Sequence, residues 1–173
     1  MTSRGPRVIE ILCGVSVLGA TAIAWSQGFA EYALRMRTTE AVQHLSYLFR
    51  MSSVYVTSER VTRPRGAVVP VQFPRSVRVT PALSRIGSRP ITDPPGTWNA
   101  PTWQALSFSV ADPHYFAYAY DSLGTGPSSA FSARAHGDLD GDRAYSTFAR
   151  GGHLNAQLEV EGPTTMFRVN ELE

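Results

Sequence analysis

Several features are scarce in this sequence of 173 residues, and each scarcity limits what the protein can be. Lysine is absent, so every basic residue is arginine, which we attribute to codon bias rather than to function. The single cysteine, Cys13, excludes an intramolecular disulfide. The formal net charge is only +2, which argues against the strongly basic surface typical of nucleic acid binding.

Charge is also missing from one long stretch, because no residue from Ile11 to Ala30 carries one. This apolar stretch is long enough for one membrane crossing. Glu10 stands at its beginning, and an ionised group in hydrocarbon costs ~2.5–3.5 kcal/mol even on lenient scales. Such a carboxylate needs a partner. Cleavage after Gly5 would make Glu10 the fifth residue of the mature chain, and the new amine of a neighbouring copy could then neutralise it.

This N-terminus resembles the prepilin-type signal of type IV pilins and type II secretion pseudopilins. That family has a short basic leader, a glycine at the cleavage point, a glutamate at the fifth mature position and then an apolar helix. Residues 1–5 match the leader, and Val8–Ile11 match the core of the signal. Pro6 stands where the family usually has phenylalanine, and Arg7 stands where a small polar residue is common.

The resemblance implies how the chain is processed and where it is found. Prepilin peptidase would cleave between Gly5 and Pro6 and would methylate the new N-terminus. The chain would cross the inner membrane once with a periplasmic head, and would reach the pilus at the cell surface after assembly. An uncleaved signal anchor and a secretory signal are the alternatives, the latter because Ala22-Ile23-Ala24 forms an A-x-A cleavage site.

Residues 8–56 are predicted to form one helix roughly 70 Å long, by a rise of about 1.5 Å per residue. Its first half is apolar on all sides, and its second half is amphipathic. Its segment 37–45 resembles the charged Glu-Ala segment of the pilin family. In the second half, apolar and small residues recur at spacings of three and four: Ala41, Val42, Leu45, Leu48, Phe49, Ser52, Tyr55 and Val56.

Prolines recur from Pro64 to Pro101, which excludes a helix interior and disfavours long central strands. We expect a Pro-rich connecting loop over 62–101 with one short strand near 76–80. The alternative is a flexible linker, but two tryptophans close together, Trp98 and Trp103, argue against it.

The C-terminal third is predicted to be antiparallel β-structure. Phe116, Tyr118 and Tyr120 alternate with alanines, a period of two that places them on one face. Together with Tyr115 they could form an exposed aromatic surface, but we expect all four rings in the core. Gly151-Gly152 is expected to break the chain. The predicted strands cover 103–111, 115–121, 131–136, 144–149, 158–161 and 166–170.

The predicted fold class is therefore α+β. A long N-terminal helix has a membrane-spanning half and an amphipathic half, and the amphipathic half packs on a small antiparallel β-sheet in a pilin-like arrangement. Residues 1–5 form the leader, 6–30 the transmembrane and assembly half, and 31–173 the extracytoplasmic head.

One group of acidic residues resembles a metal site. Asp138, Asp140 and Asp142 alternate in sequence, and their oxygens could converge on a hard cation such as calcium. An EF-hand loop would need glycine and glutamate where Arg143 and Ala149 stand. The favoured interpretation is a hairpin turn at Asp140-Gly141 with solvated aspartates. Segments 135–142 and 169–172 also resemble pilin-like head domains of the myxobacterial type.

No enzyme activity is expected. The sequence has no G-x-S-x-G nucleophile elbow, and we interpret His114 and His136 as surface or turn residues. A hydrolase, the third possibility considered, would need a compact site near His136.

The sequence thus predicts a structural subunit, of the minor class, in a type IV pilus or type II secretion filament. Glu10 would set the register between copies. The expected partners are other subunits, prepilin peptidase and the inner membrane, with no cofactor and no nucleic acid. The alternative is a membrane-anchored extracytoplasmic module that binds a ligand or calcium and forms no filament.

Overall fold

The structure is a computed structural model that describes the backbone of residues 8–62 and 70–172 and the side chains of residues 32–59 and 70–172. The chain divides into two compact units, Met1–Met36 and Arg37–Glu173. Each unit is described by itself. The second unit contains the whole β-sheet and the later part of the long helix.

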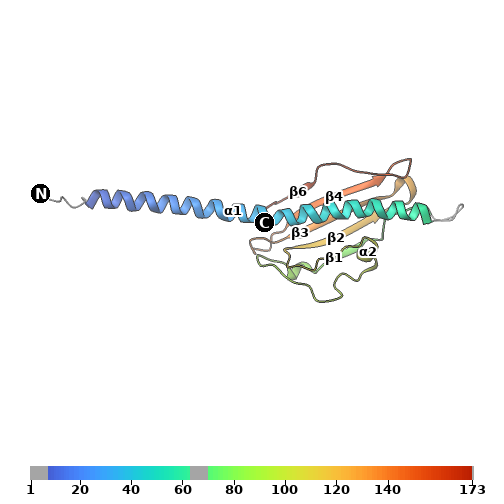
Figure 1. Cartoon of the computed structure of the whole chain (residues 1–173), viewed down its shortest axis with the longest axis horizontal. Helices are drawn as coiled ribbons and strands as arrows, with labels where there is room; N and C mark the ends of the chain where they lie inside the picture. The colour runs from blue at the N-terminus through green and yellow to red at the C-terminus, as the bar shows by residue number, and fades with distance from the viewer. Residues whose placement is uncertain (1–7, 63–69, 173) are drawn as a thin grey trace. The chain divides into compact units, whose positions relative to one another are not determined.

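One long α-helix is followed by short strands and helical turns (Figure 1). The elements are α1 (Val8–Thr62), β1 (Val77–Thr80), the 3-10 turn η1 (Leu83–Arg85), α2 (Pro101–Ala105), β2 (Phe116–Leu123), the 3-10 turn η2 (Gly126–Ser128), β3 (Ala130–Gly137), β4 (Ser146–Leu154), β5 (Val160–Glu161) and β6 (Phe167–Val169).

Helix α1 has 55 residues and continues past the predicted end at residue 56 to Thr62. Pro64 lies just beyond it, and a proline disfavours helical backbone in the residue before it. From Arg37 onward the helix lies along the sheet (Figure 1). Its buried residues follow the helical period of three and four: Thr38, Ala41, Leu45, Leu48, Ser52 and Val56.

The sheet has six strands, and all of its pairings are antiparallel. The order is β1-β2-β3-β4-β5, and β6 also pairs with β4. Strands β5 and β6 therefore share the outer edge of β4, at its end and its beginning respectively. Strand β1 forms the opposite edge, with an irregular register against β2.

The core lies between α1 and one face of the sheet. Tyr118 pairs with Ala135, and Ala135 pairs with Phe148, so these three side chains share that face. Phe116 and Tyr120 alternate with buried alanines along the same strand as Tyr118. The prediction of an aromatic core is confirmed for Phe116, Tyr118 and Tyr120, which are fully buried, whereas Tyr115 is only half-buried.

The expected fold class is wrong because it required a membrane-spanning half in the helix. Within the described parts of residues 8–62 and 70–172, no helix is both long enough and apolar enough to cross a bilayer. Where its side chains are described, α1 carries Arg35, Arg37, Glu40 and Arg50, and charges at this density are costly in hydrocarbon. The expected single-pass placement in the inner membrane is contradicted by the same finding.

Two local predictions are also wrong. Residues 103–111 do not form a strand, because α2 occupies Pro101–Ala105 with a proline in its first turn, where the fixed φ suits a helix. Gly151-Gly152 does not break the chain but lies inside β4. A Cβ at Gly151 would lie 2.6 Å from the carbonyl oxygen of Phe131, so glycine there allows a close backbone approach.

Candidate functional site

The residues predicted for processing and assembly fall outside the part that the structure describes in full. Gly5 and Pro6 precede the first described residue. Glu10 belongs to the helical backbone of α1, but its side chain is not described. The structure therefore does not place these three side chains, and their predicted roles stay predictions.

The three aspartates of the predicted metal cluster come together in the loop between β3 and β4. One carboxylate oxygen from each of Asp138, Asp140 and Asp142 lies within 4.8 Å of the others. Asp138 is only 4% exposed, whereas Asp140 and Asp142 are exposed. Carboxylate oxygen is the donor type that calcium prefers, and these three oxygens would form part of a calcium shell.

The same carboxylates also hold the loop in shape. Asp138 Oδ1 accepts a hydrogen bond from the Gly141 amide at 2.8 Å. Asp140 accepts from the amide of Asp142 at 3.2 Å, and Asp142 accepts from that of Ala144 at 2.6 Å. Each aspartate is thus explained by turn geometry alone. Like charges about 4 Å apart repel by about 1 kcal/mol even in water, so a bound cation would relieve the cluster.

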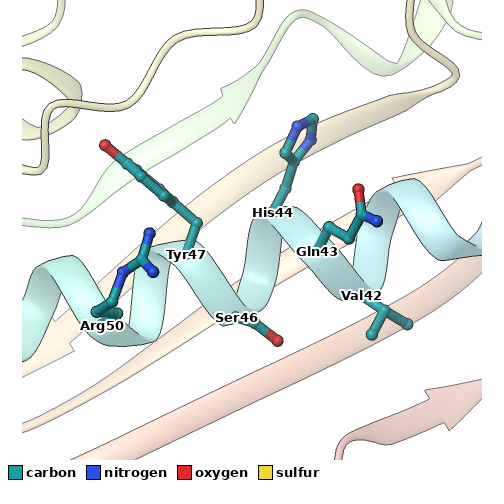
Figure 2. A pocket seen from close by; sticks show the side chains of 6 residues that line it. All are labelled: Val42, Gln43, His44, Ser46, Tyr47 and Arg50. Carbon is teal, nitrogen blue, oxygen red and sulfur yellow. The ribbon is translucent and has the colours of Figure 1, made fainter.

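A second candidate surface lies on α1, beside the residues of the helix that are fully buried against the sheet. There the helix borders a groove of about 440 Å³, and six helical side chains line it (Figure 2). We call this the α1 groove; its residues are Val42, Gln43, His44, Ser46, Tyr47 and Arg50. In Figure 2 these side chains lie on several sides of the helix, with Tyr47 and His44 pointing in one direction and Val42 in another.

Apolar side chains are exposed on α1 beyond this groove. Val54, one turn further along the helix than Arg50, is 50% exposed. In the first unit, Tyr32 and Met36 are 60% and 57% exposed. The amphipathic pattern of the second half predicted a buried side of the helix, but it did not predict a groove on the other residues. The spacing of 43, 47, 50 and 54 by three and four was the available indication.

A polar layer joins α1 to the sheet near the groove. Tyr118 donates a hydrogen bond to Glu40 Oε1 at 3.1 Å, and the Tyr115 amide donates to Glu40 Oε2 at 3.1 Å. His44 Nδ1 lies 2.7 Å from the same Tyr118 hydroxyl. A phenol has one proton, so when Tyr118 donates to Glu40, His44 must donate from Nδ1.

Burial shifts the pKa values of Glu40, His44 and Tyr118 in this layer. Desolvation raises the pKa of Glu40, although the hydrogen bonds from Tyr115 and Tyr118 oppose the shift. Burial lowers the pKa of His44, and nearby His114 lowers it further. Burial raises the pKa of Tyr118 well above its usual value, and Glu40 adds to this. The layer therefore favours a neutral imidazole and a neutral phenol.

His114 is buried, which contradicts its interpretation as a surface or turn histidine. Its Nε2 lies 3.4 Å from Asp93 Oδ2, and both side chains are almost fully buried. Asp93 also accepts a hydrogen bond from Arg85 at 2.8 Å. These groups link the Pro-rich segment to the start of β2, where Ile91 and His114 exchange backbone hydrogen bonds.

His136 lies on the face of the sheet turned away from α1. Its Nδ1 is 3.0 Å from the Thr147 hydroxyl on the neighbouring strand. Burial lowers its pKa, and the charge of Arg134 contributes. The imidazole is thus held in a cross-strand pair, an arrangement that stabilises a sheet without any catalytic role.

Comparison with known proteins found no family model, no curated protein and no solved structure that matches this chain. The resemblance to pilins therefore depends only on the residues that carry it.

Proposed function

We propose that this chain is a structural subunit, of the minor class, of a type IV pilus or type II secretion filament, and that copies assemble through α1. The observation that carries the proposal is that one side of α1 is buried against the sheet while another side is accessible to a partner. One part is buried against the sheet at Leu45, Leu48 and Val56, while another bears the α1 groove and exposed Val54.

The α1 groove supports assembly because a groove on a helix that already has a buried side offers a second surface to a partner. Val42 and the ring of Tyr47 contribute apolar surface, and Arg50 lies over the Tyr47 ring with 5.3 Å between guanidinium and ring centre. A neighbouring helix laid in this groove would bury that surface, with a gain of roughly 25 cal/mol per Å² of apolar area.

The N-terminal residues would fix the axial register between neighbouring copies. In the proposal, prepilin peptidase cleaves after Gly5, and the amine of Pro6 in one copy pairs with the Glu10 carboxylate of the next. A buried charge pair of this kind contributes mainly specificity, because a mismatched neighbour would leave one charge without a partner. Contacts between different surfaces of successive copies build an open helical filament rather than a closed ring.

Filament incorporation of single variants in the native host tests the proposal. We expect Val54→Asp to reduce incorporation strongly, because it puts a charge into an apolar contact, and Glu10→Ala to abolish it. Leu123→Asp is the matched control: Leu123 is 68% exposed but lies on β2 rather than on α1. Incorporation of both α1 variants at the wild-type level would contradict the proposal.

The mass of the native N-terminus tests the processing step separately. A mature chain that begins at Pro6 agrees with the proposal. A mature chain that begins at Trp25 indicates a secretory signal instead, and one that begins at Met1 indicates an uncleaved chain.

The aspartate cluster favours one other function, a calcium-binding module that forms no filament. The supporting observation is the 4.8 Å convergence of Asp138, Asp140 and Asp142. Calcium at a hundred times its dissociation constant would stabilise the fold by about 2.7 kcal/mol. Thermal unfolding with and without calcium, on wild type and on Asp140→Asn, measures this. An unchanged midpoint in wild type would remove this candidate.

A further inference from the structure

A polar cavity separate from the α1 groove lies between the segment after β1 and the β3–β4 loop. It measures about 560 Å³, within the ~300–1,000 Å³ typical of small-molecule sites. One wall is formed by residues 83–88 and the other by the loop that begins at Asp138 and ends at Tyr145. The two walls are far apart in sequence, so the fold creates the cavity.

Side chains fix both walls before any ligand arrives. Arg37 of α1 donates hydrogen bonds to the carbonyl oxygen of Ser88 at 3.3 Å and to that of Leu139 at 3.1 Å. One guanidinium thus ties the two walls together. Arg85, at the end of η1, is anchored on buried Asp93. A preformed cavity spares a ligand the cost of ordering its site.

The lining combines hydroxyls with groups of both charge signs. Ser84, Ser88 and Tyr145 carry hydroxyls that can donate and accept, and Asp138 adds an acceptor. Arg143 adds a guanidinium donor, and its backbone has a φ of +73°, a strained value for a residue with a side chain.

This lining selects against several ligand classes. A mainly apolar ligand would need a mainly apolar pocket, and here Leu83 and Ile86 are the large aliphatic side chains among the described lining residues. A polyanion would meet the carboxylate of Asp138 and its two acidic neighbours in the loop. A sugar ring suits both parts, with its hydroxyls on the polar groups and a C–H face on Leu83, which is half-buried.

We propose that this cavity binds a neutral, hydroxyl-rich ligand of the saccharide class, with Arg143, Tyr145 and Asp138 as the hydrogen-bonding groups. The site belongs to a single copy of the chain, so it does not depend on filament assembly. The proposal of ligand binding and the proposal of filament assembly can therefore be refuted independently.

Saturation-transfer NMR of the full chain with the methyl glycosides of glucose, galactose and mannose and with N-acetylglucosamine tests this. We expect at least one probe to bind at millimolar concentration. Arg143→Gly should weaken that binding about tenfold, the loss of one charge-assisted hydrogen bond. Glycine also accepts the positive φ, so this variant should fold. Tyr145→Phe should weaken binding by a smaller factor.

Arg168→Ala is the matched control, because Arg168 is an exposed arginine on β6 that pairs with Glu171 outside the cavity. It should bind like wild type. Absence of binding for all four probes would overturn the proposal, as would equal binding by wild type, Arg143→Gly and Tyr145→Phe. Binding that requires added calcium and is lost in Asp140→Asn would also overturn it, because a calcium ion and not the side chains of the cavity would then hold the ligand.

Discussion

The two faces of the β-sheet differ sharply in chemistry. The face toward α1 carries large rings, with Phe116, Tyr118, Tyr120 and Phe148 all fully buried. The opposite face carries small or polar side chains that form cross-strand pairs, such as Arg134 with Asp121 and His136 with Thr147. Antiparallel sheets commonly have one face in the core and one face toward water, and this sheet follows that division.

The difference shows what α1 does for the fold. A sheet of this size would expose its row of aromatic rings if nothing covered them, and α1 supplies that cover at Leu45 and Leu48. Burying one large apolar side chain contributes about 1.5–3 kcal/mol, so the face toward α1 supplies most of the stability. The other face contributes half-buried cross-strand pairs, and an ion pair such as that of Arg134 with Asp121 is typically worth ~0–1 kcal/mol.

The largest predicted effect follows from truncating a ring on the covered face. Phe148→Ala should lower the free energy of unfolding by about 3–5 kcal/mol, because it leaves a cavity against Phe116, whose ring centre lies 5.8 Å away. Ser132→Ala on the opposite face should change it by less than about 0.5 kcal/mol. Urea denaturation measures both. Similar losses for the two variants would refute the division between the faces.

A smaller loss is expected from adding a single methyl group inside β4. Gly151→Ala should cost about 1–3 kcal/mol, because the new Cβ would lie 2.6 Å from a backbone oxygen of β3. Gly87→Ala is the control, since a Cβ added there would have no atom within 4 Å outside its chain neighbours. Thermal unfolding of the pair gives the comparison. If Gly151→Ala is as stable as wild type, β4 and β3 are not held at this spacing.

The smallest effects concern pH and begin with two histidines, His44 on α1 against the covered face and His136 on the opposite face. The pKa values of His44 and His136 are both lowered, so the unfolded chain binds more protons than the folded chain. The free energy of unfolding therefore has its full value above the unfolded pKa of about 6.5. It decreases as pH falls from there through the lower folded pKa values. Urea denaturation between about pH 5 and pH 8 should show this slope, and His44→Gln and His136→Gln should each flatten it.

Glu40 acts in the opposite direction at lower pH. Its pKa is raised in the folded state, so the folded chain binds the extra proton and stability falls as pH rises from 4.5 through the folded pKa. Removing the carboxyl group in Glu40→Gln should therefore remove this fall in stability, as urea denaturation extended down to about pH 4 would measure. A pH profile that matches the wild type would contradict the direction assigned to Glu40.

Much of the sheet could be predicted from sequence because its signals are local. Alternation of aromatic rings with alanines placed β2, and Asp140-Gly141 placed the turn between β3 and β4. The helical turn at α2 could not be predicted, since Trp103 and Phe108 favour a strand by composition and only tertiary packing fixes them otherwise. The prediction that Gly151-Gly152 breaks the chain was wrong for the same reason, because the close approach of β3 that glycine allows there is a tertiary contact.

The candidate sites were less accessible to sequence reasoning. The aspartate cluster was visible because its residues are close in sequence. The proposed saccharide-binding cavity and the polar layer at Glu40 each combine residues more than fifty positions apart. Arg37 bonds to Ser88 at the cavity, and Glu40 bonds to Tyr115 in the polar layer. Amphipathic spacing showed which side of α1 is buried, but it could not show which partners that side meets. No single sequence contains that information without the fold.

The short outer strands of the sheet have a consequence for how copies can meet. The long edge of β4 is occupied by β5 and β6, which have two and three residues, and the opposite edge is β1, which has four and an irregular register. Strands this short offer too few free amides and carbonyls to recruit a strand from another molecule. Sideways growth into amyloid-like ribbons is thereby disfavoured, and a neighbouring molecule has to engage side chains instead of backbone.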